Sequence, residues 1–217
     1  DQKYKNFELV FWDNLSSDRS KEIFEKFNDK RFKYFKAEKH KILYEARNDA
    51  LRQCNGKYIS FLDTDDFWFN NKLSSQVSIM EENDNVGLVY GNYIKYNQDK
   101  FIFKKNCINP KLFKSGKITK YLIRNYFIGL LTTLIRRSFM KDELEFFDTK
   151  YNLLSDFDYI IRFSKKHEID FVRDNIAIYY QHKNQLQSKY IVNQSKQFES
   201  WYKFNLKNGE LFEKDYD

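Results

Sequence analysis

Three aspartates, Asp63, Asp65 and Asp66, lie within four consecutive residues, directly after a short apolar run. Carboxylates this close repel one another, so a fold tolerates them most easily where a cation lies among them. Oxygen ligands suit the hard cations Mg²⁺ and Mn²⁺, which commonly bridge a protein carboxylate and a diphosphate. The alternative is a solvated acidic turn that caps the next helix. The spacing alone leaves both interpretations open.

The acidic cluster follows an expected strand at residues 58–62, whose aromatic and β-branched residues are introduced by Gly56. Open α/β sheets bind ligands at the carboxyl ends of their strands, where this cluster would lie. Further strands are expected at 7–12, 31–36 and 86–96, and helices at 18–27, 42–53 and 72–82. This alternation predicts βαβ units and a mainly parallel sheet. The second half is less regular, with helices expected at 118–125, 156–165 and 194–206 and extended segments at 131–135, 171–172 and 176–180.

The composition of the 217 residues fits one α/β domain with its own core, because 41% are hydrophobic and 19% aromatic. The net charge is 38 − 31 = +7, which would suit a phosphorylated substrate, an anionic membrane surface or nucleic acid. The basic residues are dispersed rather than clustered, so no nucleic-acid partner is expected.

The two cysteines, Cys54 and Cys107, lack the spacing of metal ligands and fit reduced thiols. No apolar run approaches the roughly 18 residues of a membrane span, and no signal peptide is visible. We therefore expect a cytoplasmic protein. Its basic surplus allows peripheral contact with the inner face of an anionic membrane.

Four blocks of the sequence, in order, resemble family 2 glycosyltransferases of the GT-A fold. Residues 6–20 (NFELVFWDNLSSDRS) resemble that family's "nfElivvDDgSsDgS", while 45–51 (EARNDAL) and 56–66 (GKYISFLDTDD) resemble "ARN…a.GkyiafLDaDD", which contains the DxD motif. Residues 154–163 (LSDFDYIIRF) resemble "sEDydlwlRl", and 178–188 (IYYQHKNQLQS) resemble "yyR.H.nq.S". Each block alone is weak, but the order of the four makes the resemblance specific.

The resemblance implies an α/β fold of the GT-A (Rossmann-like) type, which binds nucleotide-sugars on a mainly parallel central sheet. We expect a single domain over residues 1–217. It would comprise a nucleotide-binding half at about 1–96, an acceptor and catalytic half at about 97–190, and a C-terminal helix at about 191–217. The family's usual first strand and helix, with "vSiiiPtyN", has no counterpart, so we expect an N-terminal portion to be missing.

Asp13, Arg47, Asp63 and Asp65 match family positions near the nucleotide-sugar. The resemblance implies that Asp13 contacts the uracil end of the nucleotide and that Asp63 contacts ribose or orients the loop. Asp13 could instead cap the next helix. Arg47 could instead be a surface arginine paired with a neighbour on its own helix, although residues two apart on a helix do not face each other.

The resemblance assigns the metal, Mn²⁺ or Mg²⁺, to Asp65 and Asp66, and places His182 near it or the diphosphate. Asp156 aligns with the catalytic base of inverting members, although Ser155 replaces the acid that usually precedes it. An inverting transfer needs one carboxylate to take the proton of the acceptor hydroxyl. Asp156 could instead cap its helix, and His182 could be an ordinary hydrogen-bonded histidine.

These residues together predict a metal-dependent, inverting glycosyltransferase of the hexosyl- or N-acetylhexosaminyl-transferase type. It would move a sugar from a nucleotide-sugar, with a UDP-sugar favoured, to a saccharide or lipid-linked acceptor in polysaccharide synthesis. One alternative is a sugar nucleotidyltransferase-like enzyme, which needs a Gly-rich phosphate loop that is not visible. Another is a non-catalytic or truncated nucleotide-sugar-binding module. A nucleic-acid binder would show affinity that falls steeply with salt.

Overall fold

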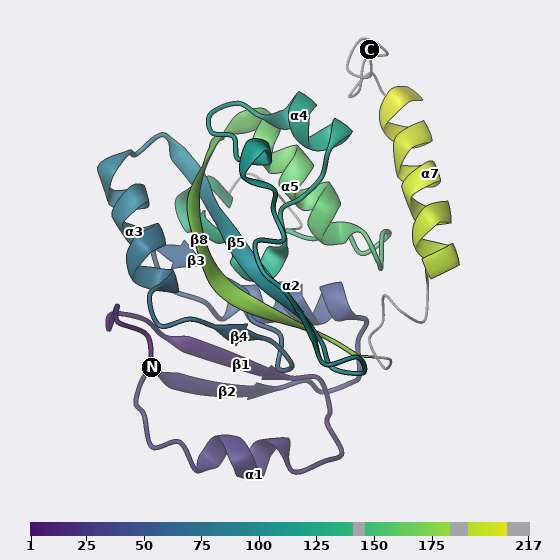
Figure 1. The fold of residues 1–217 in the computed structure, drawn as a ribbon. Coiled ribbons are helices and arrows are strands. Elements are labelled where there is room, and N and C mark those ends of the chain that lie inside the picture. The colour runs from purple at the N-terminus through teal and green to yellow at the C-terminus, as the bar shows by residue number, and fades with distance from the viewer. Residues whose placement is uncertain (141–145, 183–190, 208–217) are drawn as a thin grey trace.

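The computed structural model describes residues 1–140, 146–182 and 191–207. Strands and helices alternate in the first half, as the sequence predicts (Figure 1). The helices are α1 (Ser20–Glu25), α2 (Leu43–Arg52), α3 (Lys72–Glu82), α4 (Thr119–Arg124), α5 (Ser155–Lys166) and α7 (Ile191–Lys207), with 3₁₀ turns η1 (Pro110–Leu112), η2 (Leu130–Thr132) and η3 (Arg137–Met140). The strands are β1 (Leu9–Asp13), β2 (Phe32–Lys36), β3 (Tyr58–Ile59), β4 (Phe67–Trp68), β5 (Val86–Asn97), β6 (Ile102–Lys104), β7 (Leu134–Arg136) and β8 (Glu168–Gln181).

The strands form two sheets. β1 and β2 pair in parallel, and a larger sheet has the order β3-β7-β5-β8-β4, with β6 paired to β5. The α/β prediction is confirmed, but the expected mainly parallel sheet needs a correction. The two longest pairings, β1–β2 and β5–β8, are parallel, whereas the four short pairings are antiparallel. The larger sheet is therefore mixed.

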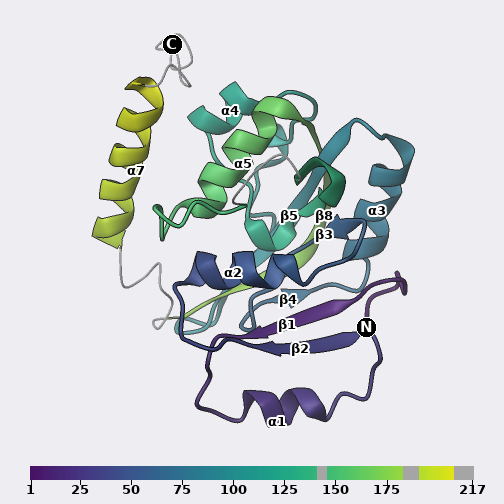
Figure 2. The same ribbon diagram turned by 180° about the vertical axis from the view of Figure 1, so that it is seen from behind.

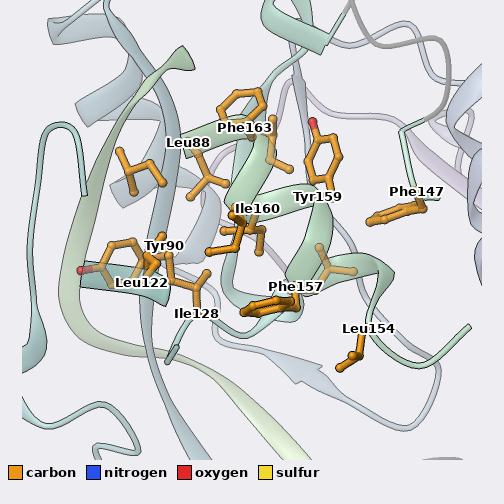
Figure 3. Packing of buried hydrophobic residues seen from close by; sticks show 14 of the residues in the cluster. Leu88, Tyr90, Leu122, Ile128, Phe147, Leu154, Phe157, Tyr159, Ile160 and Phe163 are labelled. Carbon is orange, nitrogen blue, oxygen red and sulfur yellow. The ribbon is translucent and has the colours of Figure 1, made fainter. Parts of the chain in front are cut away.

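Successive residues of the central strands face opposite layers of the molecule, as the two-residue period of a strand requires. On β5, Val89 packs with α3, while Leu88 and Tyr90 pack with the larger cluster on the other face. α3 therefore covers one face of the sheet and α4 and α5 cover the other (Figures 1 and 2). Figure 3 shows this larger cluster, in which Phe157 and Ile160 of α5 lie near Tyr90 and Ile128.

A buried lysine ties the segment before the acidic cluster to α3. The Lys72 ammonium is fully buried and donates to Ser60 Oγ at 2.7 Å, Gln76 Oε1 at 2.8 Å and the Thr133 carbonyl at 3.2 Å. It also lies 4.1 Å from the centre of the Trp68 ring. Burial lowers the pKa of Lys72 well below its ordinary value, because the charged form loses its hydration. These contacts fix both ends of the segment between β3 and β4.

Among the described glycines, Gly91 of β5 has the closest packing, against a side chain of the neighbouring strand β8. A Cβ atom built on Gly91 would lie 2.3 Å from Ile176 Cδ1, whereas one built on Gly129 would meet nothing nearer than 3.8 Å. We expect Gly91→Ala to destabilise the protein by about 1–3 kcal/mol, because the added methyl overpacks a buried site. Urea unfolding measures the change. Gly129→Ala is the matched control and should change stability little; equal effects of the two substitutions would contradict this packing.

Candidate active site

The acidic cluster lies in the loop between β3 and β4, and β8 holds it in place. β4 pairs antiparallel with β8, with Phe67 opposite Ile178. The two aspartates that precede β4 continue this pairing through their side chains. Asp66 Oδ1 accepts the Tyr180 N–H at 3.0 Å, and Asp65 Oδ2 lies 3.0 Å from His182 Nε2. The structure thus brings Asp65, Asp66 and His182 together, although 115 or more residues separate the histidine from the loop in the sequence.

Both carboxylate oxygens of Asp63, the first aspartate of the cluster, accept hydrogen bonds from Arg47 of α2. Its terminal nitrogen donates to Asp63 Oδ1 at 2.6 Å and to Oδ2 at 2.7 Å. The Arg47 side chain is 14% exposed and that of Asp63 is 51% exposed, so the pair lies at a surface with the guanidinium largely covered. Burial opposes the charge of Arg47, but Asp63, Tyr44 and Asp156 together outweigh burial and raise the pKa of the guanidinium. Arg47 therefore forms its ion pair with the cluster, and not with an acidic neighbour on its own helix.

Asp156 contacts α2 through the side chain of Tyr44. It lies in the first turn of α5, and its Oδ1 accepts the Tyr44 hydroxyl at 3.0 Å and the Phe157 N–H at 2.9 Å. Burial, together with the Asp156 carboxylate, raises the pKa of Tyr44 well above its ordinary value, so the hydroxyl stays a donor. The Tyr126 hydroxyl is buried without a hydrogen-bond partner among the described residues, and burial and Asp156 also raise its pKa.

The two acidic centres are joined by consecutive contacts across α2. Asp63 contacts Arg47, the Arg47 guanidinium lies 5.3 Å from the centre of the Tyr44 ring, and Tyr44 contacts Asp156. Arg47 and Tyr44 are one helical turn apart, which places them on neighbouring positions of one helix face. The N-terminal half of α2 therefore links the acidic loop to the start of α5.

The acidic loop carries more negative charge than its surroundings neutralise. Burial raises the pKa of Asp66 to about 7, and the charges of Asp65 and Asp63 act in the same direction. The Tyr180 N–H and Arg47 oppose the shift without cancelling it. A carboxyl that keeps its proton near neutral pH because it is buried beside other carboxylates is a position where a cation can replace that proton.

The residues predicted to hold the metal fit that role in chemistry but are not arranged as a complete ligand set. In the described ranges, no three His, Cys, Asp or Glu side chains converge as metal ligands. Asp65 and His182 meet directly, while Asp66 Oδ1 is occupied by the Tyr180 N–H. Carboxylate oxygens suit Mn²⁺, and a neutral imidazole nitrogen is the commonest protein ligand of metals in general. Asp65, Asp66 and His182 are thus the side chains that would hold such an ion.

Asp13 lies at the end of β1, buried at 3% exposure. Its Oδ1 accepts the Ser16 N–H at 2.6 Å, and its Oδ2 accepts the Tyr34 hydroxyl. Burial alone would raise the pKa of Asp13, but these hydrogen bonds lower it below its ordinary value. Burial and Asp13 raise the pKa of Tyr34 to about 12. Asp13 is therefore a buried anion that holds the turn after β1, and none of the hydrogen bonds in the described ranges joins it to the acidic loop.

The sequence did not single out three residues of this site. Tyr44 lies in an expected helix, where an aromatic side chain usually packs in the core, and Tyr126 follows the end of another expected helix. Tyr34 reads as a strand residue. The only sequence signal for Tyr44 is its position one turn before Arg47. Asp158, by contrast, is structural, since it accepts hydrogen bonds from Arg162 Nε and Trp201 Nε1, both at 2.8 Å. The block that contains His182 continues to residue 188, and residues 183–188 lie outside the described part.

Sequence comparison gives curated relatives that match about two thirds of the chain. The chain is 39% identical over 140 residues to the UDP-Glc:alpha-D-GlcNAc-diphosphoundecaprenol beta-1,3-glucosyltransferase WfgD of Escherichia coli, covering 64% of this chain and 52% of WfgD. It is 30% identical over 139 residues to the putative teichuronic acid biosynthesis glycosyltransferase TuaG of Bacillus subtilis, covering 63% of this chain and 53% of TuaG. The chain thus spans about half the length of these relatives.

Structural comparison shows the same fold in solved glycosyltransferases. The S. aureus TarS 1-349 complex with UDP-GlcNAc has a TM-score of 0.67 at 19% identity, with 86% of this chain and 54% of TarS 1-349 covered. The mannosyltransferase PcManGT from Pyrobaculum calidifontis, in complex with GDP-Man and Mn²⁺, has a TM-score of 0.64 at 16% identity, with 88% of this chain and 53% of PcManGT covered. The GT-A fold is therefore confirmed.

The family match covers most of the site described above. The family described as "Glycosyl transferase family 2" matches residues 1–143, which include β1, α2 and the acidic loop. No helix among the described residues is long and apolar enough to cross a membrane. The chain belongs to glycosyl transferase family 2.

Proposed function

We propose that this chain carries the catalytic site of a metal-dependent, inverting glycosyltransferase that uses a UDP-sugar. The single observation that carries the proposal is the continuous set of contacts from Asp63 through Arg47 and Tyr44 to Asp156. It ties a carboxylate cluster suited to a diphosphate-bound cation to a separate carboxylate suited to proton transfer. A direct displacement by an acceptor hydroxyl needs both.

Asp156 is proposed to be the general base. It would take the proton of the acceptor hydroxyl as the oxygen attacks the anomeric carbon and the nucleoside diphosphate departs from the opposite side. The Tyr44 hydroxyl, which stays protonated, fixes the carboxylate without competing for the proton.

A divalent cation, when bound by Asp65, Asp66 and His182, would supply positive charge for the departing diphosphate. In its absence the loop compensates its charge in two ways, with a proton on Asp66 and with the Arg47 guanidinium on Asp63. The complex of PcManGT with GDP-Man and Mn²⁺ supports this choice of ion.

Arg47, Asp63 and Asp65 are proposed to contact the nucleotide-sugar, and Asp13 to contact the uracil. Asp13 would accept the base N–H with a lone pair not used by Tyr34 or Ser16, since a carboxylate can accept about four hydrogen bonds. UDP as the nucleotide is supported by the name of WfgD and by the TarS complex with UDP-GlcNAc.

The acceptor is proposed to be a saccharide or a lipid-linked glycan, as the name of WfgD states for that relative. Such an acceptor would place the protein in the cytoplasm, in peripheral contact with the inner membrane face. We also propose that residues 1–217 act as one unit, with the nucleotide on the part before about residue 97 and the acceptor on the part after it.

The transfer assay tests the two carboxylates separately. With UDP-glucose as donor and GlcNAc-diphosphoundecaprenol as acceptor, we expect Asp156→Asn to lower kcat by at least about 100-fold, because a general base is lost. We expect Asp65→Asn to lower kcat similarly and also to weaken UDP binding in the presence of Mn²⁺. Asp156→Asn should leave UDP binding unchanged.

Asp174→Asn, at an exposed position of β8, is the matched control and should keep wild-type activity. Full transfer by Asp156→Asn would remove this residue from proton transfer. A wild-type chain that binds UDP with Mn²⁺ but transfers no sugar to any glycan acceptor would support a non-catalytic binding module instead.

The raised pKa of Asp66 predicts a pH dependence of stability. Between pH 4 and about 7 the unfolded chain has lost this proton while the folded protein keeps it, so the Asp66 contribution becomes less favourable as pH rises through this window. We expect Asp66→Asn to raise Tm at pH 8 relative to wild type by at least about 2–4 °C, the shift that 1 kcal/mol causes in a chain of this size. At pH 5 the difference should shrink.

The stabilisation of the protein by Mn²⁺ should depend on pH in the opposite direction to its stabilisation by the Asp66 proton. We expect it to raise the Tm of the wild-type protein more at pH 8 than at pH 5, and to have a smaller effect on Asp66→Asn at pH 8. If the Tm values of the wild type and of Asp66→Asn changed in parallel with pH and responded equally to Mn²⁺, the role assigned to Asp66 would be contradicted.

A further inference from the structure

The β5–β6 hairpin presents an exposed apolar tip. Every residue from 98 to 106 is exposed. Three consecutive apolar side chains lie in this segment, with exposed fractions of 79% for Phe101, 56% for Ile102 and 59% for Phe103. The value for Phe101 is the highest among the large apolar side chains that the structure describes. A soluble surface seldom leaves adjacent apolar side chains uncovered unless a partner covers them.

The hairpin is braced at its base. Tyr96 stacks on Phe103 across the β5–β6 pair, with ring centres 4.3 Å apart, and meets the Tyr180 ring edge-on at 5.3 Å. β5 pairs with β8 as far as Asn97 and Gln181, and both strands run together to this end of the molecule (Figure 1). The base is therefore held by two neighbouring strands, while Phe101 lies beyond the last β5–β6 pair, which joins Asn97 and Ile102.

Basic charge accompanies the apolar tip. Residues 94–106 contain four lysines and one aspartate, a net charge of 4 − 1 = +3; the lysines are Lys95, Lys100, Lys104 and Lys105. A second exposed apolar pair, Ile23 at 54% and Phe27 at 60%, provides a comparison. The surrounding residues 18–30 contain four basic and four acidic side chains, a net charge of zero. Exposed apolar residues and a basic surplus thus coincide at the hairpin and not at this second pair.

The hairpin lies at the same end of β8 as the acidic loop. Tyr180, which packs against Tyr96 of the hairpin, donates its backbone N–H to Asp66, and His182 follows two residues later to meet Asp65. A surface that covers the hairpin tip would therefore lie beside the acidic loop. Apolar side chains flanked by lysines fit the interface of an anionic bilayer, where the rings enter the headgroup region and the ammonium groups meet lipid phosphates.

We propose that the tip of the β5–β6 hairpin, residues 98–105, docks this chain on an anionic phospholipid bilayer. Phe101 and Ile102 enter the headgroup region, and Lys100, Lys104 and Lys105 contact the lipid phosphates. This inference goes beyond the proposed transfer reaction and does not depend on it, because docking needs neither nucleotide nor metal.

Flotation of the whole chain with lipid vesicles tests the proposal, without nucleotide. Wild-type protein should float with vesicles of phosphatidylcholine and phosphatidylglycerol, much less with phosphatidylcholine alone, and less at high salt. Phe101→Ser/Ile102→Ser should weaken binding at least tenfold. The matched control, Ile23→Ser/Phe27→Ser, removes an apolar pair of similar exposure and should bind as wild type does. Lys100→Gln/Lys104→Gln should reduce binding to the anionic vesicles only.

Three results would overturn the proposal: unchanged binding by Phe101→Ser/Ile102→Ser, equal loss in the control variant, or equal binding to neutral vesicles. Circular dichroism of each variant verifies folding, and both changed residues of the tip are exposed enough to leave the core intact. UDP binding by Phe101→Ser/Ile102→Ser should equal that of the wild type. A failure of docking would thus be distinct from a failure of the proposed donor site.

Discussion

The compensation of negative charge in the loop between β3 and β4 is the constraint on which the rest of the site depends. Three carboxylates in four residues repel one another, and the fold opposes this with the Arg47 guanidinium on Asp63 and a proton on Asp66. His182, which follows β8, contacts Asp65. The loop can hold its shape only if α2 and the end of β8 are both in place.

The fold supplies these parts by pairing elements that are distant in sequence. The antiparallel β4–β8 pair delivers the end of β8 to the loop, and the parallel β5–β8 pair, the longest in the molecule, supports it from the other side. Lys72 holds the segment before the loop against α3. One face of α2 then reaches both Asp63 and Asp156, so the proposed donor side and the proposed acceptor side contact the same helix.

Local patterns predicted what local interactions determine. The bounds of α3 match the expected residues 72–82, because its apolar residues repeat at helical spacing. β4 was missed since two residues, one exposed, carry no periodic signal. β8 was expected as two short strands, because the polar residues near Asn175, where the β5–β8 register shifts, interrupt the apolar pattern. The candidate site residues were proposed from the family resemblance, whereas the Arg47–Asp63 and Tyr44–Asp156 contacts depend on tertiary packing that one sequence does not display.

Calorimetric titration of UDP into the protein, with Mn²⁺ and then with EDTA, tests the central claim most directly. We expect saturable binding of UDP with Mn²⁺ that is lost or strongly weakened with EDTA, because the carboxylates of the loop cannot hold a diphosphate without a cation. Equal binding under both conditions would contradict the metal role of the loop. An absence of binding in both, with thermal unfolding showing a folded protein, would contradict the donor site itself.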